Sequence, residues 1–569
     1  MRSAAAALAL AFLTACTGGG QTPPALRMSV LLVTIDTLRA DRLGCYGDAK
    51  ARTPVLDAFA RKATLFENAF TPAPLTLPAH ASMLTGLLPP STGVRGNGGF
   101  ALPAGIPTLA EALQARGRHT AAFIGGFPLA RRYGLARGFH RYDDTLARAP
   151  GVHYELAERR AEAVVDAALK WLAGEPGPVF VWVHLFDPHA PYDPPSAYAT
   201  GDAYRDEIAA ADASLGRLLK VWDARGDSLS VVTSDHGEAF GEHGEASHGL
   251  LLYDTTLRVP LLVRGGGFPE GRRVKAPVGL ADLAATVLDA AGEAPSLPGA
   301  SLRGRLSEGT GAARLYAETF LPRQDFGWSE LVSWREGDWK YVRAPRPELF
   351  DLASDPGEAN NLAAKQADTS RRLADALERA LAGMPKRDSR KAVEPDAAER
   401  LRALGYLQGP GGKGSGADPK DKLELARKIA AATGPFKDYA DAARAYRELL
   451  RLDPENPLLN FRLADSLLRS GRAEESLPYF RRVASGAPRT AEAHVGLAAA
   501  LAQLERLEDA KAVLEAGLAI EPLSAQAHYN LGEIARVNGQ LAEARRHYEA
   551  ARGDAITGER ARARLQELK

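Results

Sequence analysis

Three apolar stretches of strand length each run into an acidic residue. These acidic residues, with the histidines beside them, are Asp36, then Asp187 with His189, and Asp235 with His236. A single acidic residue at a strand end is usually a turn former or a helix cap. Because the carboxyl ends of parallel strands gather ligand sites at one edge of a sheet, three such ends with two histidines predict a metal site of carboxylate and imidazole ligands.

A candidate nucleophile lies in the segment TLPAHASMLTG, which begins at Thr76. Pro78 suits a first helical turn, and the apolar residues after it continue a helix. A hydroxyl at a helix start lies where backbone N–H groups and the helix dipole favour an anion. Threonine is a poor nucleophile unless a metal or a base lowers its pKa. Taken alone, Thr76 is more typical of a helix N-cap than of a nucleophile.

Strands and helices alternate between Met28 and about Gln408, which predicts an α/β domain built on a mainly parallel sheet. The β-branched-rich stretches expected to be strands are 28–35, 120–124, 179–186, 229–233 and 259–263. Amphipathic stretches expected to be helices include 108–116 and 156–172. The catalytic domain is expected to span residues 28–408.

The amino terminus is typical of a bacterial lipoprotein. Arg2 precedes a short apolar run, and the sequence LTAC ending at Cys16 resembles a lipobox, in which the cysteine receives lipid. Residues 1–16 are therefore predicted to be a signal peptide with its lipidation site, and residues 17–27 a tether. The alternative is a plain signal peptide. No later segment has the roughly 20 apolar residues of a membrane span, and Cys45 remains as a free thiol that we expect to be buried.

A Gly-rich linker at 409–422 separates the first domain from a repeat region at 423–569. Three positions recur every 34 residues, the period of tetratricopeptide repeats: Pro454, Pro488 and Pro522, with Leu463, Leu497 and Leu531 in the same step. Two further kinds of residue follow the repeat. The small residues are Ala442, Ser476, Ala510 and Ala544, and the packing aromatic residues are Tyr446, Phe480 and Tyr548. The region resembles an all-α tetratricopeptide repeat solenoid with a capping helix, whose concave surface would bind a protein or peptide; unrelated helices are the alternative.

Composition excludes some classes of function. The chain has 569 residues, too many for a single small fold, and 45% of them are hydrophobic. Its net charge is +1, and the two cysteines are too few for a disulfide framework. Nucleic-acid-binding domains carry a concentrated basic excess, so no nucleic-acid partner is expected.

Several blocks of the chain, in order, resemble the sulfatase family of the alkaline phosphatase superfamily. They are IDTLRADRLGCYG around Asp36, TLPAHASMLTG, DPHAPY, SDHGEAFGEHGE, RVPLLVRG and WKYVRAPRPELFDLASDPGEANNLA. The resemblance covers Met28 to about Ala363. It implies a large mixed, mainly parallel sheet flanked by helices, with a divalent metal holding the nucleophile and an ester oxyanion.

The chain departs from the family at the nucleophile. Sulfatases carry Cys or Ser, matured to formylglycine, in a C/S-x-P-x-R motif, but this chain has Thr76 and His80 at those ends. No formylglycine is expected, and Cys45 lacks the Pro and Arg that maturation needs. The T-x-P-x-H pattern is similar to the nucleotide pyrophosphatase/phosphodiesterase branch, in which Thr attacks phosphorus. It favours cleavage of phosphate diesters or of phosphonate and phosphate esters.

The resemblance also implies roles for the remaining site residues. One metal site of the superfamily is matched by Asp36, Thr76, Asp235 and His236. Zn or Mn is favoured as the metal because the donor atoms mix oxygen and nitrogen, and Ca or Mg stays open. One metal is favoured over two; a second site would use Asp187, His189 and His248. Otherwise His189 and His248 bind the oxyanion or protonate the leaving group. The expected catalytic residues are Thr76, His80, His189 and His248, and the expected substrate contacts are Arg95 and Asn97.

Three other functions stay open: a sulfuric ester hydrolase, a phosphoethanolamine-type transferase, and a non-catalytic scaffold in which the repeats do the work. The expected partners are an anionic ester, a protein or peptide on the repeats, and a membrane reached through the lipid. The expected location is the periplasmic side of a bacterial cell envelope. The outer membrane is favoured because Thr17 follows Cys16 where inner-membrane lipoproteins commonly carry Asp.

Overall fold

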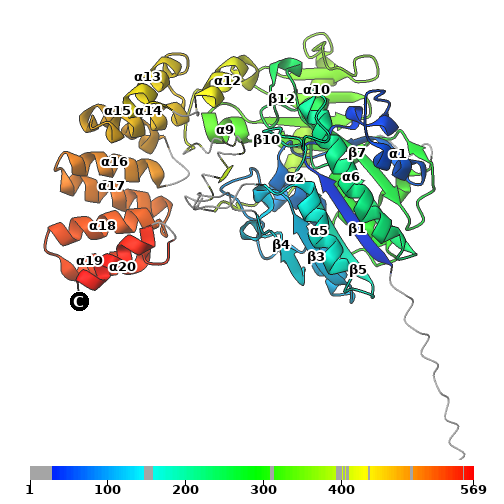
Figure 1. The fold of residues 1–569 in the computed structure, drawn as a ribbon. Coiled ribbons are helices and arrows are strands. Elements are labelled where there is room, and N and C mark those ends of the chain that lie inside the picture. Colours follow the sequence, from blue (N-terminus) through cyan, green and yellow to red (C-terminus); the bar gives the residue numbers. More distant parts are fainter. Residues whose placement is uncertain are drawn as a thin grey trace, which may run out of the picture.

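The central sheet of the N-terminal domain is mixed and mainly parallel (Figure 1). Its order is β4-β3-β5-β1-β6-β7-β2-β8, with β9 also paired to β2 and with β7 antiparallel to both neighbours. The strands are β1 (Ser29–Ile35), β2 (Thr64–Phe70), β3 (His119–Ile124), β4 (Arg141–Asp143), β5 (Val179–Leu185), β6 (Ser228–Thr233), β7 (Arg258–Arg264), β8 (Arg273–Val274) and β9 (Val278–Gly279). The β-branched runs form the strands because both faces of the sheet are buried.

The chain is described here as a computed structural model. It covers residues 28–568 apart from 147–157, 308–312, 392–396, 398–399, 402–403, 405, 407–408, 410, 433–435, 487–490 and 555–556. The predicted leader, lipidated Cys16 and tether lie outside the described residues. Cys45 is half-buried rather than buried.

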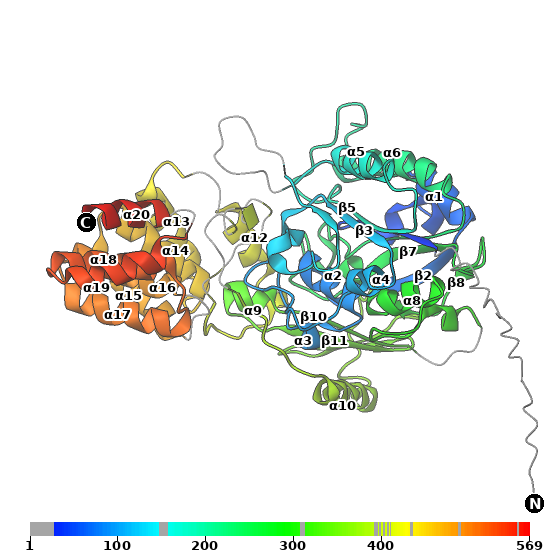
Figure 2. The same cartoon turned by 90° about the horizontal axis from the view of Figure 1, so that it is seen from below.

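Helices cover both faces of the large sheet (Figure 2). One face carries α1 (Pro54–Arg61), α5 (Ala161–Leu172) and α6 (Ala203–Asp223), whose apolar sides form one core with the sheet. The other face carries α2 (Thr76–Thr85), α4 (Leu109–Gln114) and α8 (Leu283–Ala290), which form the second core. Two single-turn helices, α3 (Pro89–Thr92) and α7 (Asp254–Leu257), lie in the connecting loops.

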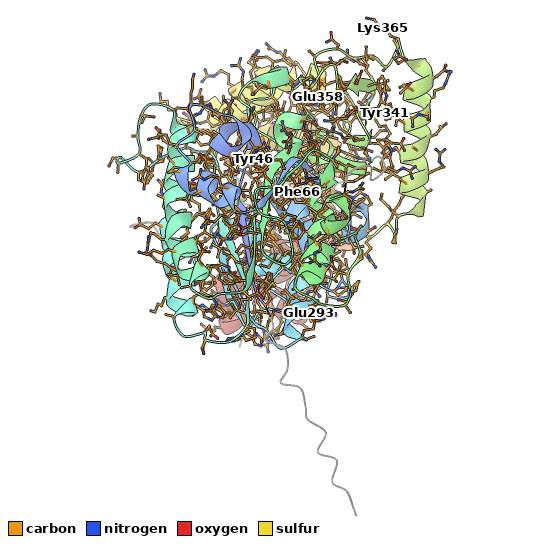
Figure 3. The ribbon with its side chains drawn as sticks, turned by 90° about the vertical axis from the view of Figure 1, so that its right-hand side faces the viewer. Tyr46, Phe66, Glu293, Tyr341, Glu358 and Lys365 are labelled. Atoms are coloured by element: carbon orange, nitrogen blue, oxygen red, sulfur yellow. The ribbon has the colours of Figure 1, made fainter. Side chains whose placement is uncertain are left out.

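A second, antiparallel sheet follows the large one, and it was not predicted from the sequence. Its strands are β10 (Arg314–Thr319), β11 (Leu331–Glu336), β12 (Trp339–Arg343) and β13 (Glu348–Asp351), with α9 (Leu321–Phe326) between the first two. Helix α10 (Ala367–Gly383) covers it on the outside. Figure 3 shows α10 beside Tyr341 of β12, which packs with Leu373, Leu377 and Leu381 of that helix.

Helix pairs make up the C-terminal region, as the 34-residue period predicts. The helices are α12 (Leu423–Ala431), α13 (Tyr439–Leu450), α14 (Pro457–Arg469), α15 (Ala473–Ser485), α16 (Glu492–Gln503), α17 (Leu507–Ile520), α18 (Ala525–Val537), α19 (Leu541–Ala551) and α20 (Thr557–Glu567). The predicted small and aromatic packing residues are all buried. In the described part of the chain, no helix has both the length and the apolar character needed to cross a bilayer.

The two regions share an apolar contact beside α9. Trp328 stacks on Phe326 with ring centroids 4.3 Å apart, and both pack against Leu459 and Leu463 of α14. The Trp328 indole N–H donates to a carboxylate oxygen of Asp453 over 2.7 Å. A buried hydrogen bond between a neutral donor and a carboxylate is among the stronger ones in proteins, so this contact fixes the first repeat against the N-terminal domain.

The predicted strands are confirmed, with no end shifted by more than one residue. The helix expected over 108–116 begins after Thr108, whose side chain forms a reciprocal cap with Glu111. The helix expected over 156–172 begins at Ala161. The expected layout, a mixed and mainly parallel α/β domain followed by an all-α region of helix pairs, is confirmed.

Candidate functional site

The predicted metal ligands lie together at the ends of two neighbouring strands. Asp36 follows β1, and Asp235 with His236 follows β6, which pairs in parallel with β1. All three side chains are fully buried. His236 Nε2 lies 3.6 Å from Asp36 Oδ1 and 3.5 Å from Asp235 Oδ2, and one donor atom from each residue lies within 4.8 Å of the others. The parallel register therefore assembles the site that the strand ends predict.

The donor atoms of this cluster fit a divalent cation. Both Asp36 carboxylate oxygens, Asp235 Oδ2 and His236 Nε2 have no hydrogen-bond partner of normal geometry in the described part of the chain. His236 Nδ1 lies 2.9 Å from the Gly237 carbonyl oxygen, which can only accept, so Nδ1 carries the proton and Nε2 presents its lone pair to the carboxylates. Buried polar atoms without partners are costly, and a bound cation would satisfy all four at once.

A strained turn after β1 sets the orientation of the second carboxylate. Thr37 has a φ of 54°, a left-handed conformation that a β-branched residue rarely adopts. In this conformation the Thr37 N–H reaches Asp235 Oδ1 at 3.3 Å, and the His236 N–H donates to the same oxygen at 2.9 Å. Backbone donors thus occupy Oδ1 and leave Oδ2 facing the cluster.

The two carboxyl groups titrate in opposite directions. Burial raises the pKa of Asp36 well above its usual range, and the Asp235 charge raises it further. Burial also opposes ionisation of Asp235, but His236, His80 and His184 outweigh it and lower the pKa of Asp235. Without added positive charge, ionisation of Asp235 is therefore favoured in this pocket, and ionisation of Asp36 costs free energy.

Thr76 begins helix α2 beside this cluster, and its side chain is fully buried. Asn97 Nδ2 lies 3.4 Å from Thr76 Oγ1, while Asn97 Oδ1 accepts from the Leu77 N–H at 2.7 Å. The Thr76 hydroxyl is also close enough to Asp36 to lower the pKa of that carboxyl. The structure therefore brings three of the sequence-predicted residues together, with Asn97 fixing both the hydroxyl and the first turn of its helix.

His80 lies behind the nucleophile. Its Nδ1 donates to the Thr76 carbonyl oxygen at 2.8 Å, and its Nε2 meets the Thr34 hydroxyl at 3.0 Å. Burial lowers the pKa of His80 to about 3, so the ring is neutral. Both ring nitrogens are thus engaged in holding the α2 start against β1, and a catalytic role for His80 stays a prediction.

His189 and His248 face each other across the cluster, with ring centroids 5.3 Å apart. His189 Nδ1 lies 2.5 Å from the Ala190 carbonyl oxygen, and His248 Nδ1 lies 3.0 Å from Glu238 Oε1. Burial lowers the pKa of His189 to about 3. Both rings therefore turn Nε2 toward the same place. In the neutral His189 ring, Nδ1 carries the proton and donates to the Ala190 carbonyl, so Nε2 presents a lone pair and donates to an ester oxygen only after the ring is protonated.

The second metal site is not assembled among the described residues. Asp187 is buried, but its Oδ2 accepts from the Ala161 N–H at 2.7 Å, at the start of α5, and its Oδ1 lies 3.6 Å from the Arg160 guanidinium. In this structure the carboxylate serves as a helix cap and an ion-pair partner, and the group of cation ligands among the described residues is Asp36, Asp235 and His236. The choice between one metal and two stays a prediction.

Arg95 points to a different environment from its neighbour Asn97. Its guanidinium lies 3.5 Å from Glu318 Oε1 and 4.2 Å from the centre of the Phe320 ring. It lines a pocket of about 600 Å³ between the domain and the repeats, together with Arg323, Arg387 and Lys413. A contact between Arg95 and the reacting group therefore stays a prediction.

Sequence reasoning missed three residues of the site: Glu238, His184 and Tyr406. Glu238 orients His248, and His184 Nε2 lies 3.4 Å from Asp36 Oδ2. Tyr406 Oη lies 3.2 Å from His248 Nε2 and 3.4 Å from His189 Nε2. Glu238 stands two residues after His236, a signal that could have found it. Neither His184, inside a strand, nor Tyr406, at the linker boundary, offers such a signal.

Comparisons with known proteins give separate matches for the N-terminal domain and for the repeats. Residues 29–293 match the family model for sulfatases, and residues 437–489 and 467–529 match models for tetratricopeptide repeats. The chain is 25% identical over 436 residues to an uncharacterized sulfatase, YidJ, of Escherichia coli, covering 62% of this chain and 86% of that protein. It is 26% identical to the choline-sulfatase of Rhizobium meliloti, covering 59% and 82%.

The fold also matches solved structures. The phosphonate monoester hydrolase of Agrobacterium radiobacter superposes with a TM-score of 0.54 at 24% identity, covering 63% of this chain and 95% of that one. At this identity the match shows the fold alone. The relatives and structural neighbours are ester hydrolases of the alkaline phosphatase superfamily.

Proposed function

We propose that this chain, which carries a sulfatase-family domain and C-terminal tetratricopeptide repeats, is a metal-dependent hydrolase of phosphate diesters or of phosphonate and phosphate esters. One observation carries the proposal: the group at the start of α2, beside the buried cation ligands, is the hydroxyl of Thr76. Threonine is not a precursor of formylglycine. Cys45, the described free cysteine, lies elsewhere, with its backbone N–H bonded to Asp57 over 2.7 Å.

The residues of the site divide the work of such a reaction. When a divalent cation is bound by Asp36, Asp235 and His236, it supplies positive charge that favours the ionised Thr76 hydroxyl and offsets the charge on the ester. Asn97 holds the Thr76 side chain in place. The Thr76 hydroxyl oxygen forms a bond to phosphorus while the bond between phosphorus and the leaving oxygen breaks. Water then releases the phosphoryl group from Thr76.

The leaving oxygen needs a proton or a hydrogen bond as it departs. His189 and His248 both direct Nε2 to the space in front of Thr76, while their Nδ1 atoms are held by the Ala190 carbonyl and by Glu238. Fixing Nδ1 in this way determines which nitrogen meets the substrate. We assign His248, whose Nδ1 is bonded to the Glu238 carboxylate, to the ester and leaving oxygens. His189 joins it there in its protonated form, because in the neutral ring the proton is on Nδ1, bonded to the Ala190 carbonyl. We assign His80 to positioning Thr76.

Initial rates on matched substrates test the proposal. The purified protein is stripped with a chelator, reloaded with Zn, Mn, Ca or Mg, and assayed on an aryl sulfate, a phosphate monoester, a phosphate diester and a phosphonate monoester. We expect turnover of the phosphorus esters, lost by at least 10³-fold in Thr76→Ala and partly retained in Thr76→Ser. Unchanged rates in Thr76→Ala would refute the nucleophile assignment.

Hydrolysis of sulfate esters is the second candidate, favoured by the relatives, which are sulfatases, one of them a choline-sulfatase. Turnover confined to the aryl sulfate would select it. Transfer of the phosphoryl group to an alcohol in place of water would identify the transferase alternative. A chain that binds no stoichiometric metal and turns over none of these esters would instead be the non-catalytic scaffold.

We also propose that the protein is anchored by lipid on Cys16 at the periplasmic side of a bacterial cell envelope, with the repeats free to bind a protein or peptide. The lipobox-like LTAC sequence supports the anchor. Labelling of cells with a radioactive fatty acid tests it: label should appear in the wild-type protein and be absent from Cys16→Ser. Equal labelling of both proteins would exclude the assignment.

A further inference from the structure

The hydroxyl of Thr34 lies between the large sheet and the helix that carries the nucleophile. Thr34 pairs with His184 in the register of β1 and β5, and Trp182 lies two positions before His184, on the same face of β5. These three side chains and that of His80 in α2 are fully buried. Thr34 Oγ1 lies 3.0 Å from each of three nitrogen atoms: Trp182 Nε1, His184 Nδ1 and His80 Nε2. One hydroxyl therefore joins two strands to the nucleophile helix.

The direction of the hydrogen bond between Thr34 and His80 follows from the chemistry of the partners. His80 Nδ1 lies 2.8 Å from the Thr76 carbonyl oxygen, which can only accept, so Nδ1 carries a proton. Burial of His80 and the positive charge of the neighbouring cation site both disfavour a charged ring, so His80 Nε2 carries no proton and accepts. The single hydrogen of the Thr34 hydroxyl is therefore donated to His80 Nε2.

The two lone pairs of Thr34 Oγ1 take the remaining contacts. The Trp182 indole N–H can only donate, so it occupies one of them. Because the hydroxyl hydrogen is already used, His184 Nδ1 must donate to the other. His184 Nε2 then carries no proton, and among the described residues it has no hydrogen-bond partner, although Asp36 Oδ2 lies 3.4 Å away. Thr34 thus determines the tautomers of both histidines.

The hydrogen bonds of Thr34 reach the nucleophile through one peptide group. Its carbonyl is that of Thr76, which accepts from His80, and its N–H is that of Leu77, which donates to Asn97 Oδ1 at 2.7 Å. Both polar atoms of the peptide group are therefore held by side chains, one of which is held in turn by Thr34. The orientation of this group sets where the Thr76 hydroxyl points, and reaction rates fall steeply when a nucleophile is misplaced.

We propose that Thr34 is a positioning residue for the nucleophile: by donating to His80, it holds the peptide group between Thr76 and Leu77 in the orientation that directs the Thr76 hydroxyl at the ester. The inference rests on the proposed function for the role of Thr76. A threonine that only stabilised the sheet would change the folded fraction of the protein but not the reaction of the folded molecules.

Kinetics of the metal-loaded full chain separate the two roles. Thr34→Val keeps the shape of the side chain but forms no hydrogen bond, so we expect kcat for the phosphorus ester to fall about 10- to 100-fold, with KM and bound metal unchanged. Thr34→Ser keeps the hydroxyl and should restore most of the wild-type kcat.

Thr120→Val is the matched control for these rates. Thr120 is an equally buried threonine of the large sheet, and its hydroxyl contacts His140 Nδ1 at 2.8 Å and the Gly138 carbonyl oxygen at 2.6 Å. This substitution should lower stability and leave kcat unchanged. A wild-type kcat in Thr34→Val, or an equal loss in Thr120→Val, would overturn the proposal.

Binding of two inorganic anions tests the position of the nucleophile without requiring turnover. Vanadate accepts the Thr76 oxygen as a fifth ligand, whereas phosphate is held by non-covalent contacts, so the ratio of their affinities reports on Thr76. Measured by calorimetry, Thr34→Val should bind vanadate about tenfold more weakly than the wild type and phosphate equally well. An unchanged ratio would speak against the positioning role. If the ratio changes as expected while the wild type turns over no ester, the positioning role holds and the proposed hydrolysis fails.

A third measurement does not depend on the folding of a Thr34 variant. Nitrogen-15 NMR of wild-type protein labelled at histidine distinguishes the two neutral tautomers near neutral pH, and the signals are assigned by their loss in His80→Gln and His184→Gln. We expect both rings to carry the proton on Nδ1. A His80 ring that carries it on Nε2 cannot accept from Thr34, and this result would also overturn the proposal.

Discussion

The metal site can be tested through the stability of the folded protein, because one substitution should stabilise the metal-free protein and destabilise the metal-loaded one relative to the wild type. Asp36→Asn removes one of the two buried carboxylates while keeping the size of the side chain. Without metal, the wild type buries both Asp36 oxygens, which have no hydrogen-bond partner among the described residues. This burial raises the pKa of Asp36, and the Asp235 charge raises it further. We therefore expect the metal-free variant to be more stable than the metal-free wild type, by about 1–2 kcal/mol.

With metal, the order should reverse. A cation that binds only the folded protein at about one hundred times its Kd adds about 2.7 kcal/mol of stability. The N-terminal domain spans about 380 residues, for which the entropy of unfolding is about 0.8 kcal/mol per kelvin, so Tm should rise by about 3 °C. Asp36→Asn loses a charged ligand and should gain less than about 1 °C from the same metal.

Thermal unfolding of chelated and metal-loaded protein measures these shifts. Asp212→Asn is the matched control because Asp212 is also a buried carboxylate, but its oxygens accept from the Val55 and Leu56 N–H groups at 3.0 and 2.8 Å. An amide NH₂ cannot accept these hydrogen bonds. Asp212→Asn should therefore lower Tm equally with and without metal. If metal raises Tm to the same extent in Asp36→Asn and wild type, Asp36 is not a ligand.

Two further predictions concern the domain contact and a buried acid. Trp328→Phe removes the indole donor to Asp453; it should cost about 1.5–3 kcal/mol beyond the loss of ring volume and should speed proteolysis of the 409–422 linker. Trp334→Phe is the control for the lost volume, because the indole N–H of this buried residue has no partner among the described residues; it should destabilise less and leave proteolysis unchanged. Equal effects of the two substitutions would disprove the role of the hydrogen bond. Burial raises the pKa of Glu245 to about 8; between pH 4.5 and 8 the folded chain keeps a proton that the unfolded chain has lost, so stability should fall as pH rises through this window, and a parallel pH profile of Tm in Glu245→Gln would contradict it.

The ligands at the strand ends could be predicted because chain order and sheet register determine them. Asp36 and Asp235 each follow an apolar run, and a parallel sheet places the ends of β1 and β6 side by side. The repeat region was predictable for a related reason, since each helix pair repeats the same local packing. The antiparallel sheet β10–β13 was not predicted, because its strands are short and mix charged with apolar residues.

The residues that sequence reasoning missed differ in kind from those it found. No local sequence pattern marks His184 or Tyr406 as a site residue, because the contacts that place them in the site are more than 140 positions away in the chain. His184 contacts Asp36, and Tyr406 contacts His248 and His189. A single sequence shows the residue type but not the partner. Asp187 illustrates the same limit, and its role in a second metal site stays a prediction. Its place after a strand resembles that of Asp36, yet the start of α5 and Arg160 engage its carboxylate first, and only the folded chain shows which partner a buried acid takes.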